Sequence, residues 1–354
     1  MSRRPIGFVI ALVVAAACAS APPANAPVLR IYPAVEWERG AAASDCQGQL
    51  DRVTAHARTL ATTGMMAVVG GRVIYEYGDV RRVSYLASVR KSILAMLFGK
   101  YIETGYINLD KTLADLNVDD HGGLLPAEKE ATIGDLLGAR SGVYHEASNA
   151  GDNLADAPPR GSQKHGTYFL YSNWDFNALG TIFERETGQS IYDALERDLA
   201  RPIGMQDFDR SLHRRTGDAA KSIHLAYHMH LSTRDMARVG YVMLRQGEWD
   251  GRTIVPRSWV RRIVTPVTRV HEMNPPGLRK GPFGYGYLWW VWDGDSARDP
   301  YDGAYTGIGA IGQFITVLPK LDMVIAHKTV PGGEAVSRTQ YLELVDRLVA
   351  ARCN

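Results

Sequence analysis

The sequence predicts an α+β protein: an antiparallel sheet built from both ends of the chain, flanked by N- and C-terminal helices, with a mostly helical insert. Three observations lead to this prediction. A helix and a β-hairpin are expected near the start, and strands rich in aromatic and β-branched residues follow Gly281. Between them, residues 106–265 carry a pattern of short helices and loops. The strands from the two ends are therefore expected to form one sheet.

Each element follows from its own pattern. Apolar residues recur with helical spacing over residues 47–61, and residues 66–77 predict a hairpin that turns at Gly70-Gly71. An apolar run predicts a buried helix over 88–103, stopped by Gly105. Further elements are expected in this order: helices at 132–137, 173–187 and 232–246, strands at 285–291, 313–317 and 323–326, and a closing helix at 340–350.

Length and composition are those of a globular protein. The chain has 354 residues, of which 45% are hydrophobic and 22% are charged, and its formal net charge is +2. This length allows one large domain or two interleaved ones. Acidic and basic residues are mixed along the chain, so no nucleic-acid partner is expected, and no oligomeric state is specified.

The first residues predict export. Arg3 and Arg4 precede an apolar stretch at 8–17 that is too short to span a membrane comfortably. We expect residues 1–26 to contain a signal peptide and the start of a linker, and residues 27–45 to form an Ala/Pro-rich linker. The expected location is the periplasm.

Two modes of cleavage are open. The small residues before Cys18 resemble a bacterial lipoprotein site, at which Cys18 becomes the lipidated first residue and attaches the protein to a membrane. Cleavage by an ordinary signal peptidase after Ala19 or Ala26 is the alternative.

Two further cysteines stand near the two ends of the folded part. An oxidising compartment permits a disulfide between Cys46 and Cys353, provided that the terminal helices lie side by side. The alternative is a pair of free, half-buried thiols.

Ser88 and Lys91 carry the strongest chemical signal. A spacing of three residues on a helix puts both side chains on one face, about one turn apart. A serine hydroxyl needs a base to become a nucleophile, and a lysine that burial keeps neutral is such a base. The alternative is a solvated pair, but the apolar residues that follow argue against an exposed helix.

Tyr171 and Asn173 form a second candidate element. A tyrosine beside a cationic lysine can have its pKa lowered enough to relay a proton. The amide of Asn173 offers both a donor and an acceptor for a substrate carbonyl or amide. The alternative for Tyr171 is a core phenol bonded to backbone.

A glycine-rich segment at 305–313 leads into a predicted strand and is the third element. Small residues at a strand edge let a substrate approach the backbone closely. A backbone N–H there, with that of Ser88, forms a candidate oxyanion hole. The alternative is a glycine-rich bulge or turn.

No metal or organic cofactor is expected. His224, His228 and His230 have metal-like spacing, but they lack an acidic partner nearby, so His228 is expected to line a pocket instead. The run 119–121, Asp-Asp-His, is interpreted as a polar loop.

Taken together and in this order, the three elements resemble the serine hydrolases of the β-lactamase fold, which include class C β-lactamases, penicillin-binding proteins, esterases and amide hydrolases. The resemblance covers about residues 47–350, within a predicted hydrolase domain at 46–353. It implies that Ser88 is the nucleophile and that Lys91 activates it. It also implies that Tyr171 passes the proton to the leaving group and that Asn173 orients the substrate.

The third motif departs from the family pattern, in which Lys-Thr-Gly or His-x-Gly is expected. One alignment places Gly307-Ile308-Gly309 there, with the N–H of Ala310 as oxyanion donor. The other places Tyr305-Thr306-Gly307 there, with Ile308 as donor. Neither supplies the cation that attracts the carboxylate of a β-lactam or a stem peptide.

The sequence therefore predicts hydrolysis of a small ester or amide through an acyl-enzyme, with a β-lactam as the less favoured substrate. Trp174, Trp289 and Trp290 are candidates for an aromatic pocket wall or for core. The alternative function is a cell-wall binding or sensing module of the same fold that acylates slowly or not at all.

Overall fold

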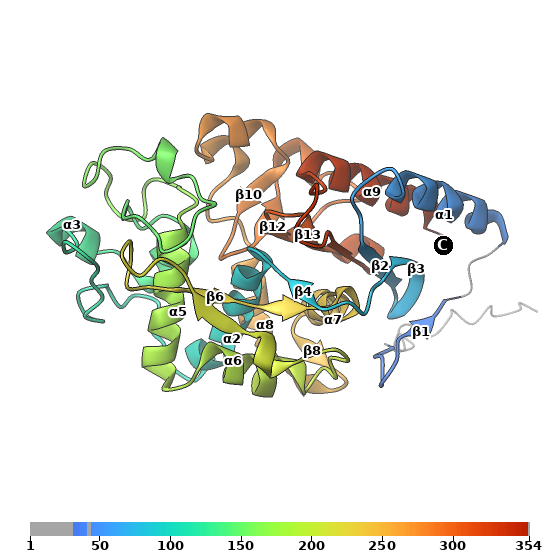
Figure 1. Ribbon diagram of the computed structural model, residues 1–354, viewed down its shortest axis with the longest axis horizontal. Coiled ribbons are helices and arrows are strands. Elements are labelled where there is room, and N and C mark those ends of the chain that lie inside the picture. The colour runs from blue at the N-terminus through green and yellow to red at the C-terminus, as the bar shows by residue number, and fades with distance from the viewer. Residues whose placement is uncertain (1–30, 41–43, 353–354) are drawn as a thin grey trace, which may run out of the picture. The chain divides into compact units, whose positions relative to one another are not determined.

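The computed structural model describes residues 31–40 and 44–352. The export signal, Cys18 and Cys353 lie outside these residues. The structure confirms the α+β prediction: a large antiparallel sheet is assembled from both ends of the chain (Figure 1). None of the described helices is long and apolar enough to cross a membrane.

The main sheet of the described chain has eight strands, and β1 is the one that pairs in parallel. The hairpin predicted at residues 66–77 forms its N-terminal part, and β14 joins that hairpin to the C-terminal strands. In spatial order the strands are β1 (Glu38–Arg39), β3 (Arg72–Gly78), β2 (Gly64–Val69), β14 (Met323–Lys328), β13 (Gln313–Leu318), β12 (Tyr305–Gly309), β11 (Trp290–Trp292) and β10 (Phe283–Tyr285).

Helices surround this sheet, and three short strand pairs lie outside it. The helices are α1 (Ser44–Ala57), α2 (Val89–Glu103), α3 (Pro126–Lys129), α4 (Ile133–Leu137), α5 (Asn173–Thr187), α6 (Ile191–Ala194), α7 (Thr233–Leu244), α8 (Arg257–Ile263) and α9 (Arg338–Ala351). The strand pairs are β4 (Ser84–Tyr85) with β7 (His230–Leu231), β5 (Arg214–Thr216) with β6 (Ala226–His228), and β8 (Glu248–Trp249) with β9 (Arg252–Thr253).

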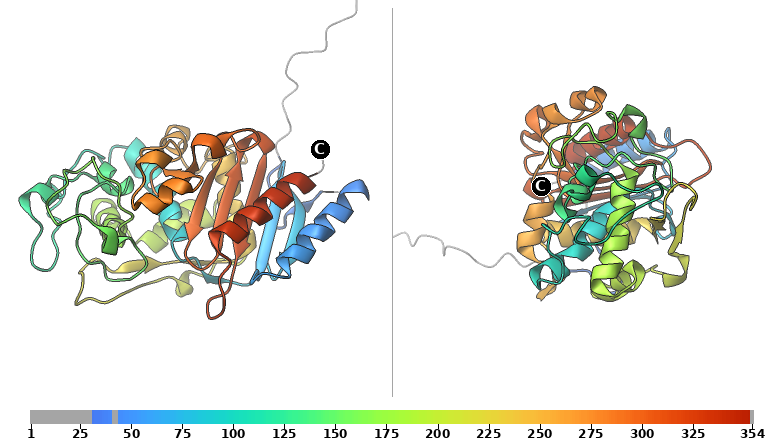
Figure 2. Two further views of the ribbon diagram at one scale, coloured as in Figure 1. Left: turned by 90° about the horizontal axis from the view of Figure 1, so that it is seen from above. Right: turned by 90° about the vertical axis from the view of Figure 1, so that its left-hand side faces the viewer.

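The two faces of the sheet are covered by different helices. On one face α1 and α9 lie side by side (Figures 1 and 2), and the ring of Tyr341 on α9 stacks on Phe314 at 3.9 Å between centroids. Strand alternation turns the neighbouring Ile315 to the other face, where α7 packs. Gly240 lets α7 approach closely, because a Cβ there would lie 2.5 Å from a methyl of Val324.

The side-by-side terminal helices meet the condition set for a disulfide. Cys46, in the first turns of α1, is disulfide-bonded. Its predicted partner lies outside the described residues, so the pairing with Cys353 stays a prediction.

Part of the predicted linker belongs to the folded domain. Residues 31–40 dock on α7, and β1 extends the sheet. The guanidinium of Arg238 donates to the carbonyls of Ala34 and Val35 at 3.1 and 2.9 Å, and the Trp37 side chain is buried. The linker prediction is therefore wrong for these residues. Ala/Pro content predicts a flexible segment, but it gives no sign that Trp37 is buried or that the backbone carbonyls accept from Arg238. We call residues 31–40 the strap.

Two other predicted boundaries differ from the structure. Helix α7 falls inside the predicted insert at 106–265 but packs on the main sheet, because its apolar face fits β13 and β14. The single strand predicted at 285–291 is a hairpin of β10 and β11. The chain reverses between them, where Leu288 adopts a positive φ of 61° and its N–H donates to the carbonyl of Leu137.

Candidate active site

Ser88 stands at the N-terminus of α2, where it is half-buried. The preceding residue, Ala87, has a φ of +48°, a conformation that costs energy for a residue with a Cβ. The neighbouring N–H of Leu86 donates to the carbonyl of Met229, which holds this turn in place. The helix that follows is buried almost throughout, as its apolar run predicts. A rigid core thus presents Ser88 at the start of a helix.

Lys91 brings the predicted catalytic groups together. Its side chain is 1% exposed, and its Nζ lies 3.0 Å from Ser88 Oγ. The same Nζ lies 2.7 Å from the phenol oxygen of Tyr171 and 2.6 Å from Oδ1 of Asn173. An uncharged amine has two N–H donors and one lone pair. It can donate to the amide and one hydroxyl while its lone pair accepts the proton of the other.

The start of α5 positions Tyr171 and Asn173. Ser172 caps this helix by accepting from the N–H of Asp175, which turns the two flanking side chains toward α2. The amide nitrogen of Asn173 donates to the carbonyl of Ala150 at 2.9 Å, so that its oxygen faces Lys91. The backbone N–H of Asn173 is held by Asp152 at 3.0 Å.

Burial sets the protonation of these groups. It holds the pKa of Lys91 well below its ordinary value, and the positive charge of Arg90 lowers that pKa further. Burial also raises the pKa of Tyr171, although a hydrogen bond with Ser88 opposes the rise. The expectation of a lowered tyrosine pKa is therefore wrong, because desolvation of Tyr171 outweighs the hydrogen bond with Ser88 and the charge of Arg90. Burial and the charge of Arg90 thus both favour the uncharged amine of Lys91, and burial favours the phenol form of Tyr171.

The glycine-rich segment forms the end of β12 and its turn, beside the nucleophile. A Cβ on Gly309 would lie 2.7 Å from the carbonyl oxygen of Leu86 and 3.2 Å from the Cβ of Ala87. A Cβ on Gly307 would lie 3.1 Å from Oγ of Ser92, one turn further along α2. The alignment ending at Gly309 therefore sets the third motif against the residue before Ser88. The close contact with Ser92 leaves no room for a long side chain at Gly307.

Two backbone N–H groups stay available near this contact. Within the described chain, neither the N–H of Ser88 nor that of Ala310 donates to another protein group. Ala310 directly follows Gly309 in the turn and is exposed. These are the two donors expected of an oxyanion hole.

The three tryptophans proposed as a pocket wall have different surroundings. Trp290 stacks on Tyr171 at 5.6 Å and an interplanar angle of 30°. Trp174 is fully buried and donates its indole N–H to Asp120 at 2.7 Å, and Trp289 is fully buried against Tyr305. Trp290 alone of the three packs on a catalytic candidate, whereas the other two are core.

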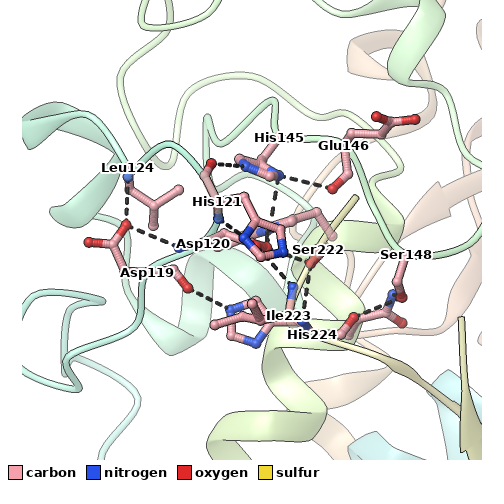
Figure 3. A network of polar contacts seen from close by, with 12 residues as sticks. Asp119, Asp120, His121, Leu124, His145, Glu146, Ser148, Ser222, Ile223 and His224 are labelled. Atoms are coloured by element: carbon pink, nitrogen blue, oxygen red, sulfur yellow. Dashed lines mark hydrogen bonds and ion pairs between the residues drawn. The ribbon is translucent and has the colours of Figure 1, made fainter. Parts of the chain in front are cut away.

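The histidine-rich and acidic segments meet in a polar network around Asp120 (Figure 3). The carboxylate of Asp120 accepts hydrogen bonds from the N–H of Ile223 at 3.0 Å and from Ser222. His224 contacts the carbonyl of Asp119 at 3.2 Å, whereas His228 contacts Tyr85. Residues 119–121 are thus a structural junction, more than the polar loop that the sequence indicates. Among the described residues no three His, Cys, Asp or Glu side chains converge as metal ligands.

Sequence reasoning missed two groups near the site. Asp152 holds the start of α5, and Arg90, between Ser88 and Lys91, is 1% exposed. A charged residue in an otherwise apolar run was a visible signal for Arg90. Nothing in the sequence marks Asp152.

Comparisons with known proteins agree with this fold. Among solved structures, a penicillin-binding protein homologue from Caulobacter crescentus is 14% identical with a TM-score of 0.65, over 88% of this chain and 99% of that one. A family VIII carboxylesterase is 13% identical with a TM-score of 0.64, over 89% and 99%. A β-lactamase from Mycobacterium bovis is 22% identical with a TM-score of 0.59, over 84% and 98%. At these identities the likeness shows the fold.

The family follows from a separate match. Residues 50–344 match the Beta-lactamase family, which covers most of the chain and all the candidate catalytic residues. The chain belongs to the Beta-lactamase family, a family of hydrolases.

Proposed function

We propose that this protein is an exported serine hydrolase that cleaves a small ester or amide through an acyl-enzyme on Ser88. The observation that carries the proposal is the buried amine of Lys91, within 3.0 Å of Ser88 Oγ and 2.7 Å of the Tyr171 phenol. A base this close to a serine is the arrangement that nucleophilic catalysis requires.

The reaction runs in two halves. Lys91 takes the proton of Ser88 as Oγ attacks the substrate carbonyl, and the N–H groups of Ser88 and Ala310 bind the oxyanion. The proton passes through the phenol of Tyr171 to the leaving alcohol or amine, and the acyl group stays on Ser88. Water then attacks the ester, gives its proton to Lys91, and releases the acid while Ser88 regains its hydrogen.

The surroundings of the third motif favour an uncharged substrate. Gly307 packs against Ser92, and in the other alignment the first position is Tyr305, a buried aromatic. Neither position offers a cation for a substrate carboxylate. An ester or a neutral amide needs no such anchor, and the fold is shared with a carboxylesterase. A β-lactam, which carries a carboxylate, is the secondary substrate.

Export is part of the proposal. Cys46 is disulfide-bonded, and disulfides persist mainly in oxidising compartments. The positively charged, apolar start of the chain agrees with such a route. Both a periplasmic form and a form anchored through Cys18 are compatible with this support.

Replacement of Ser88 tests the reaction directly. In Ser88→Ala, hydrolysis of p-nitrophenyl butyrate should fall by about three orders of magnitude or more, because the nucleophile is gone while the fold remains. Intact-mass spectrometry after fluorophosphonate treatment should show one adduct in the wild type and none in the variant. Ser84→Ala is the matched control, because the Ser84 hydroxyl is buried without a hydrogen-bond partner in the described chain.

Undiminished ester hydrolysis in Ser88→Ala would refute the assignment. A wild-type protein that forms a stable adduct but turns over neither an ester panel nor a chromogenic cephalosporin would instead support the binding or sensing module.

A further inference from the structure

Arg90 is a buried cation that forms no ion pair with any described residue. It occupies the first turn of α2, directly before Lys91, and is 1% exposed. One nitrogen of its guanidinium donates to Oδ1 of Asn177 at a long 3.4 Å, and its carbon lies 4.5 Å above the ring of Tyr227. Its Nε and Nη1 have no hydrogen-bond partner in the described chain.

Such a side chain is costly, and a second arginine shows the ordinary solution. Arg238 is buried to the same degree and its Nε also has no partner in the described chain, but its two terminal nitrogens donate to four carbonyls, including Ile203 at 2.6 Å. Within the described residues, the hydrogen bond that the Arg90 side chain donates goes to a neutral amide and not to a carboxylate. A buried charge that is neither paired nor fully hydrogen-bonded destabilises a fold. Packing therefore does not explain Arg90.

We propose that Arg90 is an electrostatic positioning residue, whose uncompensated charge holds the adjacent amine of Lys91 in the uncharged form that accepts the proton of Ser88. This inference rests on the proposed function. Arg90 and Lys91 are consecutive residues of one helical turn, and both are removed from water. Two positive charges so placed repel each other strongly, because the surrounding medium screens little. Guanidinium groups are effectively always charged in proteins, so the repulsion acts on the protonation of the amine.

Other charged groups lie around Arg90 and Lys91, but they do not cancel the effect of Arg90 on the pKa of Lys91. Burial is the largest cause of the lowered pKa of Lys91, the charge of Arg90 is the second, and Asp152 raises that pKa. Burial likewise lowers the pKa of His228 to about 4, again with Arg90 as the second cause, so His228 is uncharged at neutral pH. The titratable groups that face Arg90 or Lys91 from neighbouring elements are Asp152, Tyr171, Tyr192, Tyr227 and His228.

The test compares a neutral and a charged replacement. The rate of Ser88 labelling by a fluorophosphonate is measured against pH for the wild type, Arg90→Met and Arg90→Lys, with kcat/KM for p-nitrophenyl butyrate alongside. Loss of the charge raises the pKa of Lys91, so the acid limb in Arg90→Met should move up by about one pH unit. At a fixed pH on the acid side of this limb, the labelling rate of Arg90→Met should be about tenfold below that of the wild type. Arg90→Lys should keep the wild-type limb.

Thermal unfolding separates this role from a structural one. Arg90→Met removes an unpaired buried charge, so its Tm should equal or exceed that of the wild type. Arg238→Met is the matched control, because it strips a partner from four carbonyls. It should lower Tm and leave the acid limb in place. Arg90→Gln serves as a second neutral variant and should reproduce the shift.

Two results would overturn the inference. One is an unshifted acid limb in folded Arg90→Met or Arg90→Gln; the other is an equal shift in Arg90→Lys, which would implicate packing. Both leave Ser88 labelling of the wild type intact. Failure of the proposed function would instead appear as a Ser88→Ala variant that hydrolyses esters as fast as the wild type.

Discussion

Tyr171 shows how one side chain takes its role from its surroundings. Its ring stacks on Trp290 and lies 4.8 Å from Phe176, between centroids, while its hydroxyl meets the Lys91 amine. The aromatic contacts fix the ring, and burial keeps the phenol protonated. A protonated phenol next to a neutral amine can receive a proton on one side and release one on the other.

Tyr171→Phe should therefore slow turnover by about two to four orders of magnitude, with little change in Tm. The ring contacts remain, and only the proton path to the leaving group is lost. Steady-state hydrolysis of an alkyl ester, followed by titration of the acid released, measures the effect, because an alkoxide leaving group needs this proton. Tyr305→Phe is the control, because its buried hydroxyl has no hydrogen-bond partner among the described residues. Equal rates in Tyr171→Phe and the wild type would remove Tyr171 from the mechanism.

At the scale of elements, the contact of α7 with the sheet helps to hold the strands that form the site. The strands β13 and β14 turn Ile315 and Val324 toward α7, and Gly240 gives them room. The same strand β13 pairs with β12, which carries Gly309 to the residue before Ser88. Helix packing and site geometry are thus connected through one sheet.

Gly240→Val should destabilise the protein by about 1–3 kcal/mol, because overpacking forces α7 away from the strands. A Cβ at this position would lie 2.5 Å from a methyl of Val324 and 2.9 Å from a methyl of Ile315. Chemical denaturation followed by tryptophan fluorescence measures the loss. Gly48→Ala in α1 is the control, since a Cβ there meets nothing within 4 Å. That change should stabilise by up to about 1 kcal/mol. An unchanged stability in Gly240→Val would contradict the close packing.

At the scale of the whole molecule, the strap adds β1 to one edge of the sheet and packs on α7, which lies far from it in sequence. Tyr241 on α7 donates to the carbonyl of Ile31 at 2.6 Å, and its ring meets the buried Trp37 at 5.7 Å. Arg238 forms no ion pair with a described residue, and its guanidinium donates instead to the strap carbonyls and to Ile203. Most of its hydrogen bonds therefore depend on residues 31–40.

A chain that begins at Ser44 should have a free energy of unfolding about 3 kcal/mol or more below that of a chain that begins at Ile31, because loss of the strap leaves the buried guanidinium of Arg238 short of acceptors. Differential scanning calorimetry of the two chains gives the comparison. Val35→Ala in the longer chain is the control, because this side chain is 77% exposed and only its carbonyl is used. Equal Tm values for the two chains would show that the strap contributes nothing.

Local patterns carried much of the prediction. The helices at 88–103 and 173–187 and the strand at 313–317 were predictable because each repeats one periodicity over several turns or pairs. The split of 285–291 into two strands was not. It depends on a left-handed Leu288 whose N–H is satisfied by Leu137, a residue that the sequence does not place nearby.

The sequence by itself determined the chemistry on offer: a serine and a lysine one helical turn apart, a phenol and an amide before another helix, and glycines at a strand end. Spacing along one element is a local property, which the chain encodes directly. Only the tertiary structure decided that the pKa of Lys91 is lowered, that the pKa of Tyr171 is raised, and which glycine meets the residue before Ser88. Each of these depends on desolvation and close contact between segments far apart in sequence, which exist only when the chain is folded.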